Sequence, residues 1–312
     1  MNGGDWRPTA RADVLARRAR WLAEIRAFFA DRHVLEVQTP VLAAAGVTDV
    51  HIDGMREAGS GRWLQTSPEY AMKRLLAAGV GDCYQIAPAF RAGEQGRWHN
   101  PEFTLLEWYR LGFDAPALMD EVSMLVDRIL GPGHYHRDSY QGFFLAAGLP
   151  DPLTATADAL QKAAAEATTS PPGGLDRSGL LDWLFSETVV PALPPRAFVT
   201  GFPAEQAVLA RREAADPRVA ARFELFCNGV ELANGFDELT DPGELRGRLE
   251  RDQQQRRTTE RAVPGIDERL MAAMAHGLPA CAGVALGLDR LFALAAGVDS
   301  IAEVMAFDWP HA

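Results

Sequence analysis

Two acidic residues on a predicted β-hairpin have the type and spacing to bind a divalent cation. Asn228 and Gly229 lie between apolar residues and predict a two-residue type I′ turn. With that turn, Glu224 faces Ala233. Alternation of side chains then puts Glu224 and Glu231 on one face as diagonal neighbours, with backbones roughly 7–8 Å apart. Both carboxylates could hold one cation at that spacing. A solvated strand face without a ligand is the alternative.

Arginines beside glycines predict phosphate binding at two places in the chain. Arg91 and Arg97 lie in or beside a polar loop, residues 91–100, and guanidinium groups bind phosphate in bidentate fashion. Arg290 follows a glycine-containing strand near the predicted start of a helix, where phosphate can also bind. Neither segment has the Walker A or G-x-G-x-x-G spacing, which disfavours a P-loop or Rossmann mode of nucleotide binding.

A further polar group ends an otherwise apolar strand face. On the predicted strand of residues 103–109, Glu107 and Tyr109 share the face of two apolar residues. This pattern favours a pocket wall, and an exposed strand end is the alternative.

The elements that must position these residues mix hairpins with helices. We expect helices at 14–32, 118–130 and 242–261, strands at 34–37, 82–87, 103–109 and 197–201, the hairpin at 222–238, and a strand and helix at 282–296. Residues 150–195 predict an appended helical region with a loop at 171–174. Because regular βαβ alternation is missing, the order favours an α+β fold with an antiparallel sheet flanked by helices.

Composition is that of a globular cytoplasmic protein. Of the 312 residues 47% are hydrophobic and 23% charged, and no run approaches the roughly 20 apolar residues that span a bilayer. The polar N-terminus lacks the apolar stretch of a signal peptide. The three cysteines have neither metal-site nor disulfide spacing. The formal net charge of −11 argues against a large nucleic-acid footprint.

In combination, these motifs resemble the catalytic core of a class II aminoacyl-tRNA synthetase, specifically its lysine branch. The resemblance covers residues 14–308, and the three class signatures lie in residues 14–40, 90–109 and 287–290. Residues 66–70 and 231–239 are typical of the lysine branch. The resemblance implies a single catalytic domain over residues 1–312 with a small helical insertion at about 150–195. It also implies a homodimer, since the first signature forms the dimer interface in the family.

One difference from lysyl-tRNA synthetases bears on the acceptor. Those enzymes carry an N-terminal anticodon-binding domain, whereas the first signature here begins within about 20 residues of Met1. The chain therefore resembles the branch that ligates lysine, preferentially (R)-β-lysine, to translation elongation factor P. The implied reaction is ATP-dependent formation of an aminoacyl-adenylate, followed by attack of a protein lysine amine. No membrane contact and no stable tRNA complex are expected.

The resemblance also implies a role for each residue of the site. Arg91 and Arg290 are the expected catalytic residues, on the α- and γ-phosphates of ATP, and Glu224 and Glu231 are the expected magnesium ligands. Further ATP contacts are expected from Ala92, Gly93, Asn100, Glu231, Leu232 and Gly287. The lysine pocket is expected to be lined by Ser67, Glu69, Tyr109 and Glu238, assisted by Glu107, Asn234 and Ala285.

Two positions depart from the pattern of lysyl-tRNA synthetases. Gly93 stands where the family usually has an acid, so the roles of Gly93 and Glu94 carry over less firmly than that of Arg91. Ala285 stands where those synthetases have glycine. One added methyl group in the pocket is worth ~1–3 kcal/mol of discrimination. This difference favours a β-amino substrate.

Three rival functions follow from the same signatures. The first is a truncated lysyl-tRNA synthetase that charges tRNA or a tRNA-like RNA, and the negative charge disfavours it. The second is an asparagine synthetase of the same fold, although Glu69, Glu107 and Glu238 prefer a substrate with an amino side chain. The third is a non-catalytic regulator. Such proteins usually lose the motif arginines or the metal carboxylates, which are all present here.

Overall fold

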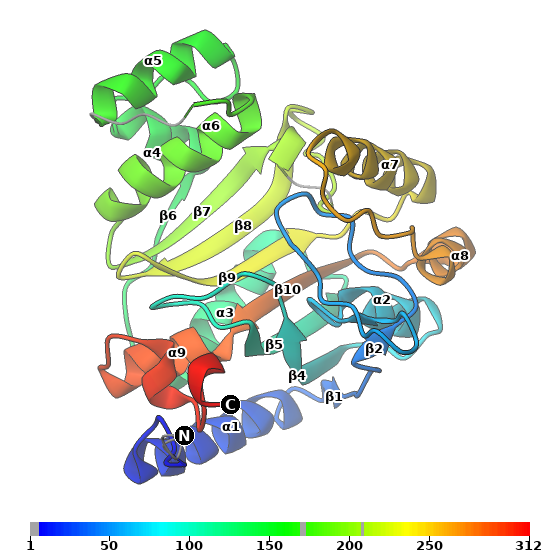
Figure 1. Cartoon of the computed structure of the whole chain (residues 1–312), viewed down its shortest axis with the longest axis vertical. Helices are drawn as coiled ribbons and strands as arrows, with labels where there is room; N and C mark the ends of the chain where they lie inside the picture. The colour runs from blue at the N-terminus through cyan, green and yellow to red at the C-terminus, as the bar shows by residue number, and fades with distance from the viewer. Residues whose placement is uncertain (1–5, 169–172, 207–208) are drawn as a thin grey trace, which may run out of the picture. The chain divides into compact units, whose positions relative to one another are not determined.

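The computed structural model describes residues 6–168, 173–206 and 209–312. The chain divides into two compact units (Figure 1), one formed by Met1–Pro132 with Thr240–Ala312 and the other by Gly133–Leu239. The loop predicted at 171–174 lies partly outside the described residues.

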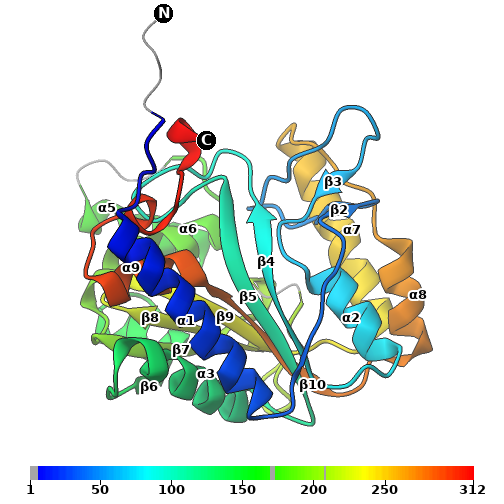
Figure 2. The same ribbon diagram turned by 90° about the horizontal axis from the view of Figure 1, so that it is seen from below.

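The first unit is built around a sheet with the strand order β1-β4-β5-β10. β1 pairs with β4 in parallel, and the other neighbours are antiparallel. Figure 2 shows α1 running along this unit and α2 beside α8. Its elements are α1 (Ala12–Ala30), β1 (Leu35–Glu36), β2 (Leu42–Ala43), β3 (Trp63–Leu64), α2 (Glu69–Ala77), β4 (Cys83–Phe90), β5 (Glu102–Leu111), α3 (Ala115–Leu130), α7 (Pro242–Thr258), α8 (Glu268–Gly277), β10 (Cys281–Gly287), α9 (Leu288–Ala296), η4 (Ile301–Val304) and η5 (Trp309–His311).

Aromatic packing between helix and sheet fixes the core of the first unit. The helical spacing of apolar residues in α1 buries Ile25, Phe28 and Phe29 completely. The ring of Phe29 stacks on Tyr84 of β4 with centroids 4.2 Å apart and meets Trp108 of β5 edge-on. Buried aromatic pairs of this kind stabilise beyond the area that they remove from water. These ring contacts anchor both β4 and β5 on α1. The loop of residues 91–100 extends from these two strands.

The second unit has the strand order β9-β8-β7-β6, with only β6 and β7 parallel among these pairs. Its core is a cluster of stacked aromatic rings that includes Tyr140, Phe144 and Phe185. Its elements are β6 (His136–Ser139), α4 (Tyr140–Ala146), α5 (Ala157–Ala167), α6 (Arg177–Leu184), η1 (Phe185–Val189), η2 (Val190–Ala192), β7 (Arg196–Pro203), η3 (Ala204–Gln206), β8 (Val219–Cys227) and β9 (Val230–Asp237).

The mainly antiparallel strands with their covering helices confirm the predicted α+β class, and the two parallel pairs make the sheets mixed. Helices α2 and α8 and the β6–α4 segment were not predicted. The prediction of a single domain over residues 1–312 stays a prediction. Among the described residues, no helix combines the length and the apolar character that crossing a bilayer requires.

Candidate active site

The predicted turn of the β8–β9 hairpin is confirmed, and its register is partly wrong. Asn228 and Gly229 have φ values of +50° and +74°, as a type I′ turn requires. Next to the turn the strands pair as predicted, but a bulge between Leu225 and Phe226 shifts the ladder. Glu224 therefore pairs with Asn234 and not with Ala233. An extra residue in one strand of a pair leaves no signal in a simple alternation pattern.

Glu224 is a buried acid in an unusual electrostatic setting. It is 7% exposed, which excludes the solvated face considered for this residue. Burial raises the pKa of Glu224 to about 7, the nearby Arg222 guanidinium opposes that rise, and the negative charge of Glu231 adds to it. Arg222 donates to Glu224 through Nη2 and to the side-chain oxygen of Asn234 through Nε at 3.2 Å. The two carboxylates are thus close enough for their charges to interact, as those of two ligands of one cation would.

The donor chemistry of this hairpin fits magnesium. Within the described parts of the chain, no group of three or more His, Cys, Asp or Glu side chains forms a metal site. Magnesium, however, is commonly held by one or two carboxylates together with substrate phosphates, and Glu224 and Glu231 supply that number. Glu238, the third acid of this unit with a predicted role, is 4% exposed. Its backbone forms an isolated antiparallel β-bridge with that of Ala210. Leu232 is buried as well.

In the first unit, four of the predicted lysine-pocket residues meet around one buried carboxylate. Ser67 Oγ and Tyr109 OH donate to the two oxygens of Glu107, each at 2.6 Å. Ser67 Oγ also accepts from the backbone N–H of Glu69 at 3.0 Å, at the start of α2. Ala285 of β10 pairs with Glu107 across the ladder, which puts its methyl group beside the strand that carries the acid.

The environment of Glu107 disfavours its charge. The residue is 2% exposed, and burial raises its pKa to about 7, assisted by the charge of Glu69 and opposed by both hydroxyl donors and by Lys73. Lys73 Nζ lies 2.5 Å from Glu69 Oε1. Sequence reasoning missed this buried lysine. The signal available was its i,i+4 spacing from Glu69.

Arg91, the predicted phosphate-binding arginine of the second signature, has a buried donor that an anion could satisfy. Arg91 lies 5.0 Å above the ring of Phe103, and its ion pair with Glu94 is long, at 3.8 Å. Its Nε is buried without a hydrogen-bond partner among the described residues. An unsatisfied buried donor is costly, so its presence favours a missing acceptor such as a phosphate oxygen.

The second predicted arginine lies against the same loop. Arg290, near the start of α9, donates through Nε to Trp98 O at 3.0 Å, and its Nη2 lies 2.8 Å from His99 Nε2. Gly287 is the residue immediately before α9. Asn100 is buried and bonds to Glu102 O and to the N–H of Trp309. Arg97, in contrast, is exposed and pairs with Asp299.

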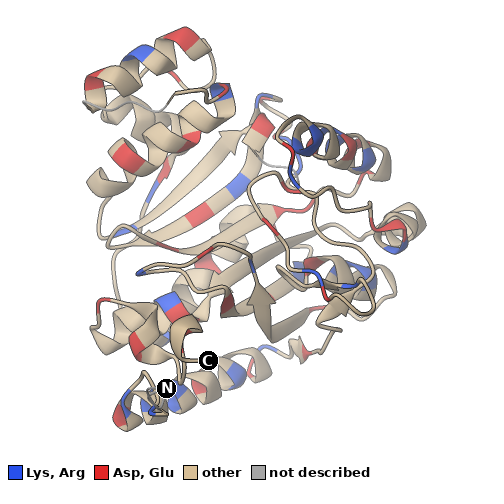
Figure 3. Cartoon of the chain, viewed as in Figure 1, with Lys and Arg blue, Asp and Glu red and all other residues tan. Residues whose placement is uncertain are grey.

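The predicted residues form three groups, two of them in the first unit and one in the second. The first unit brings together the arginines with Ala92, Gly93, Asn100 and Gly287, and separately the pocket of Ser67, Glu69, Glu107, Tyr109 and Ala285. The second holds Glu224, Glu231, Leu232, Asn234 and Glu238. Figure 3 shows the acids and arginines of these strands and loops within a largely uncharged framework. The shared use of all three groups in one reaction stays a prediction.

Comparison with known proteins agrees with this geometry. The chain is 47% identical to a protein of Vibrio cholerae named elongation factor P–(R)-β-lysine ligase, over 100% of both chains. Proteins with the same name from Vibrio vulnificus and Yersinia enterocolitica are 47% and 48% identical over 99% and 97% of both chains. The family described as tRNA synthetases class II (D, K and N) matches residues 4–310. This chain belongs to that family of class II synthetases.

Proposed function

We propose that this protein is a ligase that activates lysine, preferentially (R)-β-lysine, with ATP and transfers it to a lysine side chain of elongation factor P. The observation that carries the proposal is the buried Glu107 carboxylate, hydrogen-bonded by Ser67 and Tyr109 and close to Glu69. Acids that remain buried at such a cost are typical of a functional site. A substrate with two ammonium groups supplies positive charge beside Glu107.

The lysine pocket recognises the substrate by charge and shape. The ammonium group of lysine offsets the desolvation of Glu107, and Ser67 and Tyr109 fix the carboxylate in one orientation. The family resemblance adds Glu238 and Asn234 of the second unit as further residues that contact the substrate. The Ala285 methyl group favours the β-amino isomer by narrowing the pocket.

Activation proceeds by attack of the substrate carboxylate on the α-phosphate of ATP, which forms the aminoacyl-adenylate and releases pyrophosphate. Arg91 stabilises charge that develops on the α-phosphate, and Arg290 holds the γ-phosphate. Ala92, Gly93, Asn100, Leu232 and Gly287 make the remaining nucleotide contacts. Glu224 and Glu231 would hold Mg²⁺, and the bound ion would neutralise phosphate charge. Catalysis is then chiefly positioning and electrostatics.

Transfer to a protein acceptor is supported by the relatives. The three relatives above are named for elongation factor P, and their lengths match that of this chain. An amine of the acceptor attacks the adenylate carbonyl, forms an amide and releases AMP. Transfer to tRNA is the second candidate, because the family includes tRNA synthetases.

The test has two stages. ATP–pyrophosphate exchange is measured with α-lysine and with (R)-β-lysine, and the mass of elongation factor P is then measured after incubation with each amino acid. We expect exchange with both and a mass increase of one lysyl group, greater in rate with the β-isomer. Absence of exchange with either isomer removes the catalytic proposal, which leaves the non-catalytic regulator.

The proposal includes a cytoplasmic homodimer. The first class signature contains α1 and β1, and Leu35 in β1 is exposed. Light scattering tests this directly, with an expected mass of twice 34.0 kDa. A monomer at micromolar concentration contradicts it.

A further inference from the structure

A buried arginine on α7 binds an irregular segment of the first unit through every nitrogen of its guanidinium group. Arg256 is 1% exposed. Its Nε donates to the carbonyls of Thr48 and Asp49, at 3.1 and 3.2 Å. Its Nη2 donates to Asp49 O at 2.8 Å and to Ile52 O. Burying a guanidinium is costly unless all its donors are satisfied, and here they are.

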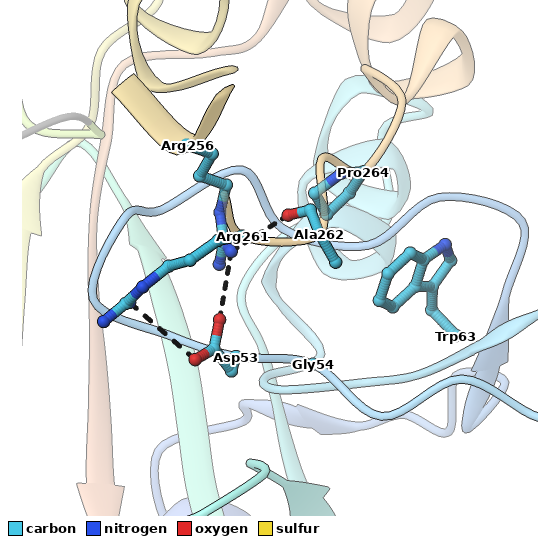
Figure 4. A pocket seen from close by; sticks show the side chains of 7 residues that line it. All are labelled: Asp53, Gly54, Trp63, Arg256, Arg261, Ala262 and Pro264. Atoms are coloured by element: carbon cyan, nitrogen blue, oxygen red, sulfur yellow. Dashed lines mark hydrogen bonds and ion pairs between the residues drawn. The ribbon is translucent and has the colours of Figure 1, made fainter. Parts of the chain in front are cut away.

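The third nitrogen closes the cluster on an acid. Arg256 Nη1 donates to Asp53 Oδ1 at 3.0 Å and to Ala262 O at 3.1 Å. Figure 4 shows the Asp53 carboxylate with dashed lines to both Arg256 and Arg261, at the edge of a pocket that Trp63 also lines. Arg261 Nη1 donates to Val50 O at 2.5 Å. The two arginines thus donate hydrogen bonds to four carbonyls of the segment, those of Thr48, Asp49, Val50 and Ile52.

These carbonyls need side-chain partners because the segment has no regular structure of its own. Residues 48–53 belong to neither a helix nor a strand, so ladder hydrogen bonds do not satisfy their backbone groups. Thr48 adds a side-chain bond to Asp252, one turn before Arg256 on α7, at 3.2 Å. The conformation of the segment therefore depends on α7.

The end of this segment is bonded directly to the residue after Arg91. The N–H of Ala92 donates to Asp53 O at 2.7 Å. On the other side, the N–H of Arg91 donates to Pro101 O at 2.9 Å. The backbone around Arg91 is thus fixed by two bonds, and one of them reaches the residue whose carboxylate Arg256 holds.

We propose that Arg256 is a positioning residue for the activation step, which acts by fixing Asp53 so that its carbonyl holds the backbone of Ala92 and Arg91. The inference rests on the proposed function only in its kinetic consequence. A misplacement of a catalytic group by about 1 Å can cost roughly 100-fold in rate. The lysine pocket does not include this segment, so lysine binding is expected to change little.

The experiment compares two arginines of the same helix. Arg248 is 4% exposed and pairs with Glu244 of its own helix at 2.5 Å. Arg256→Met and Arg248→Met therefore each remove one buried guanidinium from α7. Amide hydrogen exchange of a peptide that contains Ala92 is measured in both variants. We expect exchange at Ala92 at least tenfold faster in Arg256→Met and unchanged in Arg248→Met.

Kinetics of pyrophosphate exchange then separate positioning from stability. For Arg256→Met we expect kcat to fall at least tenfold, with the lysine KM within twofold of wild type. A double variant with Arg91→Lys should be no slower than Arg91→Lys alone, since both changes act on one group. Arg256→Lys, which keeps the charge with fewer donors, should restore part of kcat and serves if the Met variant does not fold.

Unchanged exchange at Ala92, or additive losses in the double variant, overturns the proposal. A wild-type protein without pyrophosphate exchange contradicts the proposed function instead. In that case the hydrogen exchange at Ala92 still decides whether Arg256 positions this backbone.

Discussion

Glu107 belongs to the predicted lysine pocket although its buried position disfavours the ionised carboxylate. Its two oxygens accept from Ser67 and Tyr109, yet burial keeps its pKa near 7. The sequence predicted the acid and the tyrosine on one strand face, because alternation is a reliable guide to sidedness. It did not predict Lys73 beside Glu69, since a lysine on a helix is usually solvated.

This pKa predicts a pH-dependent affinity for lysine. An ammonium group binds the ionised carboxylate, so protonation of Glu107 below pH 7 competes with binding. We expect the lysine KM in pyrophosphate exchange to fall severalfold between pH 6 and pH 8. Glu107→Gln should raise the KM about tenfold or more, through loss of a charge-assisted contact, and should flatten the pH profile. An equally steep profile in that variant contradicts the role of Glu107.

Ala285 carries the prediction on isomer preference. Its methyl group stands across the ladder from Glu107. Ala285→Gly enlarges the pocket by one methyl, a change worth ~1–3 kcal/mol in discrimination. We expect the ratio of kcat/KM for (R)-β-lysine over α-lysine to fall about tenfold, with the KM for ATP unchanged as the control. An unchanged ratio shows that the preference arises elsewhere.

At the scale of elements, α7 illustrates what hydrophobic patterning cannot find. Its start was predicted closely, and in the structure Asp241 caps the helix, with Pro242 as its first residue. Its buried face, however, contains Arg248, Asp252 and Arg256 as well as two leucines. From the sequence alone, a face with these charged residues predicts exposure to solvent. Their burial is explained only by the residues that pack against them in the structure. The bulge in the β8–β9 hairpin was missed for a similar reason, because it depends on packing in three dimensions.

The pKa of Asp252, on this buried face of α7, predicts how the stability of the protein changes with pH. Burial, assisted by the charge of Asp49, raises its pKa to about 7. The folded state then binds more protons than the unfolded state between about pH 4 and pH 7, so this group's contribution to stability is lost as the pH rises through that window. We expect Asp252→Asn to show a smaller loss of urea midpoint from pH 5 to pH 8 than wild type. Parallel pH profiles for the two proteins contradict the raised pKa.

At the scale of the whole chain, the signatures predicted the family because they combine residues that a synthetase needs at three distant places. The α+β class followed from element order, and the confirmed family match spans residues 4–310. The division into two compact units did not follow, since contact density leaves no mark in local patterns. Residues from both units carry predicted roles, so the chain has to be tested intact.

The acceptor is the property that depends most on the molecule as a whole. A formal net charge of −11 disfavours a polyanion such as tRNA, whose binding requires many phosphate contacts and weakens steeply with salt. We expect labelled lysine to accumulate on elongation factor P and not on tRNA when both are present. A lysyl-tRNA synthetase charging the same tRNA preparation is the control for its competence. Salt-sensitive transfer to tRNA, with none to elongation factor P, establishes the rival function, because pyrophosphate exchange alone is common to both.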